Sequence, residues 1–145
     1  MSLDGAYDPD NVFAKIIRGE LPAAKVFEDD HALAFLDLFP QARGHTLVLP
    51  KAPARNLLEA DEAALGELIL RVRKVARAVR SALRPDGLSV MQFNGLAGGQ
   101  TVFHLHFHVI PRWEGQAAAG HGSTGMADKD ELAELARLIG AELQP

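Results

Sequence analysis

The sequence predicts an α+β domain in which five antiparallel strands form one sheet, with helices on one face. Three observations predict this class. The chain has 145 residues, 48% of them hydrophobic, which is enough for one domain with its own core. Short strand patterns follow one another through tight turns, as they do in antiparallel sheets. One long run of apolar residues at three- and four-residue spacing indicates a dominant amphipathic helix.

The first half of the chain is expected to hold a short helix and three strands. Residues 1–10 are polar and acidic, unlike a signal peptide, and form an N-terminal extension. Asp10 or Asn11 can cap the helix that follows, and Gly19 can end it. Strands are predicted at residues 24–27, 32–37 and 45–49, and a hairpin turn at residues 28–31.

The second half is expected to begin with the long helix. Apolar residues from Leu65 to Leu83 recur with the helical period, and the RPDG sequence at 84–87 ends the helix. Its second half is rich in arginine and lysine, which we interpret as a solvated face that complements the negative helix C-terminus, rather than as a nucleic-acid patch. Strands at 88–93 and 102–110 follow. A last helix is predicted at 129–139, with an acidic capping box at Asp128 and Glu131 and an end at Gly140.

Composition excludes several classes of protein and site. The chain has no cysteine, which excludes disulfides, thiolate zinc sites and cysteine nucleophiles and fits a cytoplasmic setting. No apolar stretch approaches the roughly 20 residues that a membrane span needs. The formal net charge of −4 argues against broad binding to a nucleic-acid backbone. We therefore expect neither a membrane nor a nucleic acid as a partner.

The chain is expected to divide into three parts. A domain at residues 11–112 lies between the N-terminal extension and a C-terminal loop and helix at 113–145. The stretch after Trp113 is rich in glycine and alanine and predicts a mobile loop or lid, in which His121 is expected to be solvated. A five-stranded sheet has two edges, and an exposed edge or helix face would favour dimerisation.

The segment HLHFHVI at residues 104–110 is the chemical centre of the sequence. Alternate side chains of a strand point the same way, so His104, His106 and His108 are expected on one face, with the apolar residues between them facing the core. Three charged imidazoles would repel one another, so at least one is expected to be neutral near pH 7. A neutral imidazole offers one lone pair, which can serve as a nucleophile, a base or a metal ligand.

Two other interpretations of the histidine row stay open. It can be a polar row without chemistry, or it can bind a metal. The outer Cα atoms would lie about 13 Å apart at a rise of about 3.3 Å per residue, so one tetrahedral ion cannot easily reach all three imidazoles. A metal would need further ligands, for which Asp37, His45 or His121 are the candidates.

The glycines just before this strand predict what binds beside the histidines. Gly95, Gly98 and Gly99 let the backbone come close to a ligand. Backbone N–H groups here and the Thr101 hydroxyl suit an anionic oxygen. The spacing differs from that of a Walker loop. A glycine turn directly ahead of a histidine row is a stronger indication of an anion site than a glycine turn alone.

The sequence resembles the histidine triad (HIT) family, whose pattern alternates three histidines with apolar residues. HLHFHVI fits that pattern, and the FLD, GHTLV and GQTVFHLHFHVIPR segments are similar to the bacterial Hint-like branch. The resemblance covers about residues 11–112. It implies the HIT-like fold, a five-stranded antiparallel sheet with two main helices paired as a homodimer. It also implies binding of a purine nucleotide, usually an AMP or GMP moiety, with no cofactor.

The resemblance implies a catalytic role for four histidines. His106 would attack the α-phosphorus and form a nucleotidyl-histidine intermediate, which water then cleaves to release a nucleoside monophosphate. His104 and His108 would hold phosphate oxygens and the tautomer of the nucleophile, and help to protonate the leaving group. His45 matches the fourth histidine of the family. The protein is thereby expected to be a nucleoside phosphoramidase or related nucleotide hydrolase.

The nucleotide-binding positions also transfer by resemblance. Asp37 matches a carboxylate that binds ribose hydroxyls, although a turn cap is its alternative role. The apolar walls around the base would be formed by Phe13, Ile16, Phe35 and Leu38. The residues beside the phosphate would be Asn94, Gly99, Gln100 and Thr101.

Two departures from the family pattern bear on metal and substrate. Some relatives bind a structural zinc, but Asn11, Ala14 and Pro53 stand where its ligands would be, so no structural zinc is expected. The tail after Trp113 is unlike the familiar ones, which leaves the substrate open. A non-catalytic nucleotide-binding module and a metal-dependent hydrolase that uses the histidine cluster remain the alternative functions.

Overall fold

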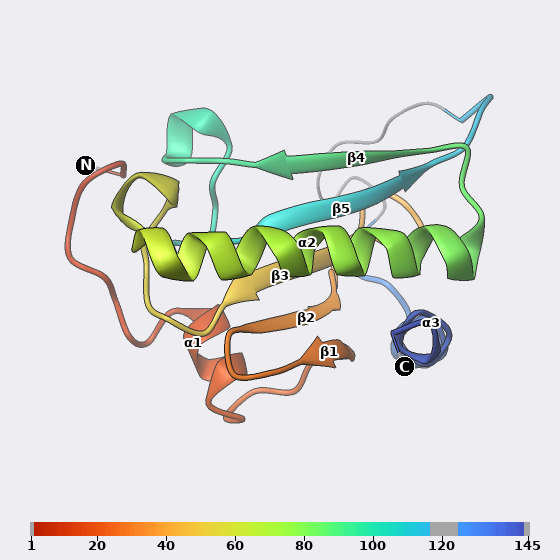
Figure 1. Ribbon diagram of the computed structural model, residues 1–145, viewed down its shortest axis with the longest axis horizontal. Helices are drawn as coiled ribbons and strands as arrows, with labels where there is room; N and C mark the ends of the chain where they lie inside the picture. The colour runs from red at the N-terminus through yellow and green to blue at the C-terminus, as the bar shows by residue number, and fades with distance from the viewer. Residues whose placement is uncertain (1, 117–124, 144–145) are drawn as a thin grey trace.

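The computed structural model describes residues 2–116 and 125–143 and contains a five-stranded antiparallel sheet in the order β1-β2-β3-β5-β4 (Figure 1). This confirms the predicted α+β class and strand number. The centre of the predicted lid lies outside the described residues, and His121 lies outside them too. The elements are α1 (Val12–Ile17), β1 (Lys25–Glu28), β2 (Ala32–Leu36), β3 (Thr46–Pro50), the 3₁₀ turn η1 (Leu57–Glu59), α2 (Glu62–Leu83), β4 (Gly87–Gln92), the 3₁₀ turn η2 (Leu96–Gly98), β5 (Phe107–Arg112) and α3 (Lys129–Ala141).

Helices cover both faces of the sheet, which differs from the expected one-sided arrangement. On one face, Ala34 of β2 and Val48 of β3 pack with the apolar residues of α2 and α3. On the other, Phe35 of β2 packs with Phe13 and Ile16 of α1. The reason is that strand residues alternate between faces, and β2 and β3 are buried along their whole length. Their second face therefore needs a cover, which α1 supplies in part.

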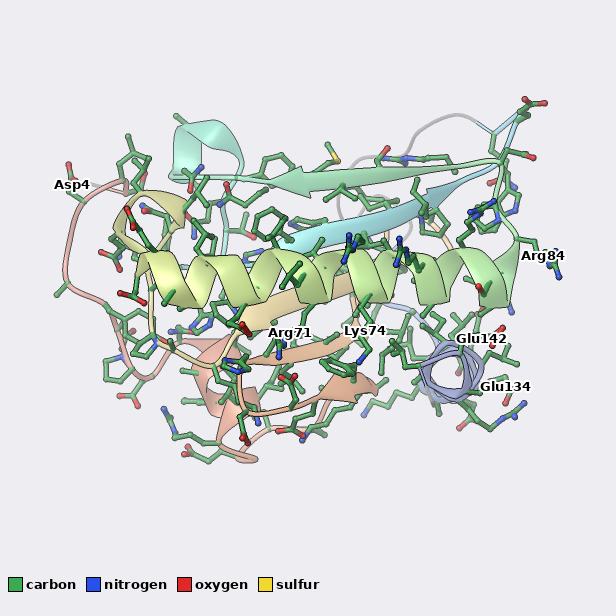
Figure 2. The ribbon with its side chains drawn as sticks, in the orientation of Figure 1. Asp4, Arg71, Lys74, Arg84, Glu134 and Glu142 are labelled. Carbon is green, nitrogen blue, oxygen red and sulfur yellow. The ribbon has the colours of Figure 1, made fainter. Side chains whose placement is uncertain are left out.

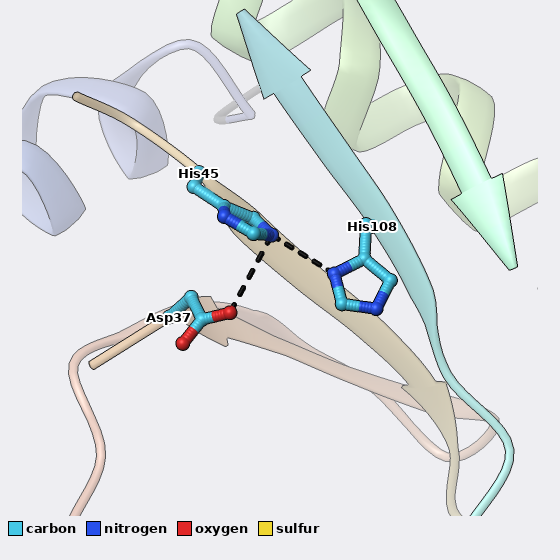
Figure 3. Close-up of side chains that lie close together, drawn as sticks. All are labelled: Asp37, His45 and His108. Atoms are coloured by element: carbon cyan, nitrogen blue, oxygen red, sulfur yellow. Dashed lines mark hydrogen bonds and ion pairs between the residues drawn. The ribbon is translucent and has the colours of Figure 1, made fainter. Parts of the chain in front are cut away.

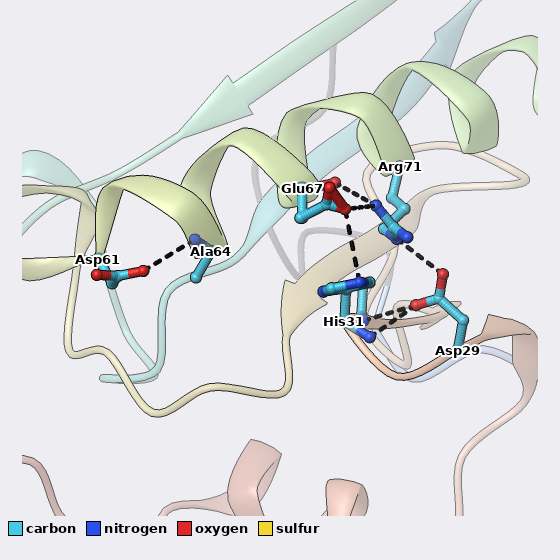
Figure 4. Close-up of polar contacts among 7 residues, drawn as sticks. Asp29, His31, Asp61, Ala64, Glu67 and Arg71 are labelled. Atoms are coloured by element: carbon cyan, nitrogen blue, oxygen red, sulfur yellow. Dashed lines mark hydrogen bonds and ion pairs between the residues drawn. The ribbon is translucent and has the colours of Figure 1, made fainter.

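The long helix α2 is fixed at its start and beside the β1–β2 turn (Figure 4). The Asp61 carboxylate caps its N-terminus by accepting a hydrogen bond from the Ala64 N–H at 3.1 Å. Arg71 donates from Nε to Asp29 at 2.8 Å and from Nη1 to Glu67 at 2.9 Å. The helix ends at Leu83, directly before the RPDG sequence as predicted, and its C-cap residue Arg84 has a left-handed backbone. In Figure 2, Lys74 lies on the side of α2 toward β1, where its Nζ is 4.8 Å from the centroid of the Phe27 ring, and Arg84 lies at the C-terminal end of the helix.

Strand β5 begins at Phe107, so the prediction of a strand from residue 102 is wrong. The antiparallel register pairs Phe107 with Val48, and extending it would bring β5 to Pro50. Pro50 has no N–H to donate, and its carbonyl lies 2.7 Å from His104 Nε2. At this point a hydrogen bond from the His104 side chain takes the place of backbone pairing between strands. His104 and His106 therefore lie in the irregular segment ahead of β5.

Helix α3 continues past Gly140 to Ala141, so the predicted end at Gly140 is also wrong. A Cβ at Gly140 would lie 3.3 Å from the carbonyl oxygen of Val26 in β1. Glycine therefore serves close packing of α3 on the sheet rather than termination. None of the helices in the described part of the chain is both long enough and apolar enough to cross a membrane.

Candidate active site

His106 and His108 lie side by side on the sheet face that α1 partly covers. His108 is paired with Leu47, which belongs to the apolar cluster on that face. The centroids of the two imidazole rings are 5.0 Å apart, and the His106 ring meets Phe13 of α1 edge-on at 4.8 Å. Both side chains are largely buried. The fold thus brings two imidazoles next to an apolar wall.

The hydrogen bonds of His45 fix the tautomer of His108 (Figure 3). The Gln41 backbone N–H donates to His45 Nδ1 at 2.9 Å, so the proton of a neutral His45 ring lies on Nε2. That Nε2 is 2.9 Å from His108 Nδ1 and 3.4 Å from Asp37 Oδ2. His108 Nδ1 accordingly accepts, and its own proton lies on Nε2.

His106 has the opposite tautomer, inferred from its partner. Its Nδ1 is 2.7 Å from the carbonyl oxygen of His104. Because a carbonyl can only accept, Nδ1 carries the proton and Nε2 of the neutral ring carries the lone pair. Two adjacent imidazoles therefore differ at Nε2, where His106 offers a lone pair and His108 an N–H.

His104 has a different position from the other two histidines. Its ring is fully buried, with Nε2 against the carbonyl of Pro50 and Nδ1 2.6 Å from the Tyr7 hydroxyl. Burial lowers the pKa of His104 below its usual value, and the hydrogen bond to Pro50 opposes this shift only partly. His104 is therefore held neutral, with its proton on Nε2.

Sequence reasoning missed Tyr7 as part of this site. It lies in the N-terminal extension, outside the predicted domain, yet its ring contacts His104 edge-on, with the ring centroids 5.7 Å apart. Tyr7 is the only tyrosine in the chain, and it is the only aromatic residue among the first ten. A lone aromatic residue in an acidic, glycine- and proline-containing segment is the signal that could have drawn attention to it.

The residues expected to contact the base are gathered next to the histidines. Phe13 and Phe35 pack edge-to-face with centroids 5.5 Å apart, and Ile16 belongs to the same cluster. Leu38 is more exposed and follows Asp37, just after the end of β2. Asp37 is 5% exposed, and its Oδ1 accepts a hydrogen bond from the Phe39 N–H at 2.8 Å. It therefore caps a turn and also lies beside His45.

Comparison with known proteins decides the family. The family model described as HIT domain matches residues 18–115. The chain belongs to the HIT family. A crystal structure of a Hit-like protein involved in cell-cycle regulation from Bartonella henselae, with an unknown ligand, is 50% identical, covers 95% of this chain and 100% of its own, and superposes with a TM-score of 0.89. The histidine triad is thus a family feature, and the HIT-like fold is shown.

Two further relatives indicate what this family does. A hypothetical histidine triad nucleotide-binding protein from Sulfolobus tokodaii is 37% identical over 90% of both chains, with a TM-score of 0.83. The adenylylsulfatase HINT3 of Arabidopsis thaliana is 40% identical over 105 residues, which are 72% of this chain and 53% of that protein. At the family level, this HIT protein belongs to a superfamily of nucleotide-binding proteins and hydrolases.

The expected phosphate-side amides are engaged within this HIT chain itself. The buried Gln100 side chain accepts from the Gly95 N–H at 2.8 Å and donates to the carbonyls of Arg55 and Val102. Asn94 accepts from the Leu57 N–H at 2.9 Å and exchanges hydrogen bonds with the Gln92 amide. These amides fix the turn that precedes the triad.

Gly99 and Thr101 belong to the same turn as these amides. Gly99 has a φ of 104°, which favours glycine, and its ideal Cβ would lie 3.4 Å from the Phe93 ring. Thr101 is exposed to solvent.

Asp37, His45 and His108 could also hold a metal ion. One possible ligand atom from each lies within 4.8 Å of the others. His45 Nδ1 already accepts from Gln41, so coordination through Nε2 would require that ring to lose its proton or its backbone contact. The hydrogen bonds of His45 and His108 thus fit neutral rings with fixed proton positions better than they fit a metal centre. Asn11, at a family zinc position, instead caps α1.

Proposed function

We propose that this protein cleaves a bond at the α-phosphate of a purine nucleotide, as a nucleoside phosphoramidase or acyl-nucleotide hydrolase, through a nucleotidyl-histidine intermediate on His106. The observation that carries the proposal is the opposite proton arrangement of the adjacent imidazoles at Nε2. One ring can attack while the other donates a proton or a hydrogen bond, which is the arrangement that two-step phosphoryl chemistry needs.

In the first step, the Nε2 lone pair of His106 attacks the α-phosphorus. A new P–N bond to the ring forms, and the bond from phosphorus to the leaving amine breaks. The departing amine takes up a proton, for which His108 Nε2–H is the candidate donor. The carbonyl of His104, which accepts a hydrogen bond from His106 Nδ1–H, stabilises the positive charge that develops on the ring.

In the second step, water attacks the same phosphorus and the bond to His106 Nε2 breaks. The water gives its proton to His108 Nε2, which gave one to the leaving amine in the first step, and the products are a nucleoside monophosphate and both imidazoles in their starting state. Splitting the displacement in two lets one site serve different leaving groups. The base would lie against Phe13 and Phe35, and Asp37 would bind the ribose hydroxyls.

Adenosine 5′-phosphoramidate is the substrate that tests this proposal. We expect the protein to release AMP and ammonia, and His106→Ala to lower the rate by about a thousandfold or more, because removal of a covalent nucleophile costs that much in comparable enzymes. Product release is measured by chromatography of the nucleotides, and the intermediate by mass spectrometry of the acid-quenched protein. Unchanged turnover in His106→Ala would exclude the mechanism.

Two controls separate the alternative functions. Binding of AMP without turnover and without a trapped adduct in the wild type would indicate a non-catalytic nucleotide-binding module. Activity that is lost in EDTA and returns with zinc would indicate a metal-dependent hydrolase. Adenylyl sulfate, suggested by the name of the Arabidopsis relative, tests the range of leaving groups. We also propose that the protein acts as a homodimer.

A further inference from the structure

The N-terminal extension follows the surface from η2 to α1 and is fixed at both ends (Figure 1). The Leu96 N–H donates to Ser2 Oγ at 2.7 Å, and Asn56 Nδ2 donates to the carbonyl of Leu3 at 2.8 Å. At the far end, the Asn11 side chain donates to the carbonyl of Asp8 at 2.7 Å. Tyr7 therefore lies on a segment that hydrogen bonds hold in place on both sides.

The Tyr7 hydroxyl meets the one His104 nitrogen that can accept a hydrogen bond. The carbonyl of Pro50 requires the proton of His104 on Nε2, which leaves the lone pair on Nδ1. Tyr7 donates to this atom at 2.6 Å. With both ring nitrogens engaged, the ring has a defined rotation and a defined tautomer.

The position of His104 matters because its backbone carbonyl fixes the neighbouring nucleophile. That carbonyl accepts the His106 Nδ1 proton at 2.7 Å. Among the described residues, the segment ahead of β5 pairs with no strand, so a few separate hydrogen bonds hold it in place of the ladder. The hydrogen bonds that hold this segment include the two made by the His104 ring and the one from the Leu105 N–H to the carbonyl of Ala54 at 2.8 Å. A shift of the His104 ring would therefore move the carbonyl that orients His106.

We propose that Tyr7 is a positioning residue for the nucleophile: its hydroxyl fixes the ring of His104, and the carbonyl of His104 then orients His106. The inference rests on the proposed function of His106. It makes the N-terminal extension part of the site rather than an appendage to the domain. Tyr7 itself takes no part in bond making or breaking.

Tyr7→Phe tests this role, because it removes one hydroxyl and keeps the ring. We expect kcat for adenosine 5′-phosphoramidate to fall about three- to tenfold, the equivalent of one hydrogen bond, with KM unchanged within about twofold. Ser2→Ala is the matched control, since it removes a hydroxyl contact of the same extension away from the histidines. A Tyr7→Phe variant with the kcat of the wild type would overturn the proposal, as would an equal loss in Ser2→Ala.

A second readout needs no substrate and distinguishes failure of this inference from failure of the proposed function. Histidine ¹⁵N NMR observes the His106 Nδ1 proton, whose exchange with water we expect to become about three- to tenfold faster in Tyr7→Phe and to stay unchanged in Ser2→Ala. If the wild type hydrolyses no nucleotide, the proposed function fails, and the exchange rate alone decides the positioning role. Equal exchange rates in all three proteins would then overturn it.

Discussion

Burial of His104 makes the stability of the protein depend on pH. Desolvation lowers the pKa of this ring in the folded state, whereas the unfolded chain takes up the proton near pH 6.5. Between the two pKa values the unfolded state binds more protons, so the free energy of unfolding falls as the pH drops below about 6.5. The loss is at most about 1.4 kcal/mol per pH unit for one such group.

Urea unfolding of wild type and His104→Gln at about pH 7.5 and about pH 5.5 measures this dependence. Glutamine can still donate to the carbonyl of Pro50 but does not titrate. We expect the wild type to lose more stability than His104→Gln between the two pH values. An equal loss in both proteins would show that other groups carry the pH dependence.

Residue types could be predicted from the sequence, but their proton positions could not. The alternation of three histidines marked the site, and four of the expected residues, His106, His108, His45 and Asp37, lie together in the structure. Which nitrogen carries each proton depends on backbone groups distant in sequence, such as the Gln41 N–H facing His45. Tyr7 was missed for the same reason, because it is 97 residues from His104.

At the scale of elements, the turn before β3 depends on the shape of a single glycine. Gly44 has a φ of 92°, and an added Cβ would meet the Leu83 side chain at the end of α2. We expect Gly44→Ala to lower the free energy of unfolding by about 1–3 kcal/mol, because a side chain in this backbone region is strained. Urea or thermal unfolding checks this value.

Gly66 provides the matched control for this prediction. It lies within α2, is exposed, and has open space where a Cβ would be placed. Gly66→Ala is therefore expected to raise the free energy of unfolding by about 0.5–1 kcal/mol through helix propensity. If both alanine variants shift stability in the same direction, the conformational argument for Gly44 is wrong.

Most element boundaries followed from local sequence, and the two clear errors have tertiary causes. Caps at Asn11 and Asp128 formed where the sequence places short polar side chains before the predicted helices. The predicted start of β5 was wrong because the His104 ring bonds to the carbonyl of Pro50, which is 54 residues away in sequence. Gly140 was misread because the contact that requires a small residue lies on β1. Local pattern therefore predicts the elements, and packing decides where they end.

At the scale of the whole molecule, the two sheet edges differ in their ability to pair. The β1 edge carries Lys25 and Glu28, which discourage strand addition, and α3 packs closely against it. The β4 edge, GLSVMQ, has no charged residue, and its Val90 is 49% exposed. Val90 pairs with Val109, which belongs to the core on the α2 side. The β4 edge is therefore the surface through which we expect the homodimer to form.

Light scattering coupled to size exclusion over a range of concentrations tests this assembly. We expect a mass of twice the 15.6 kDa of one chain for the wild type. Val90→Lys should raise the dissociation constant about tenfold or more, because a charge on the β4 edge would be buried at the interface. Leu58→Lys is the control, since Leu58 is 73% exposed on η1, outside the sheet. A monomeric wild type would refute the dimer. Equal weakening by both lysines would place the interface away from the β4 edge.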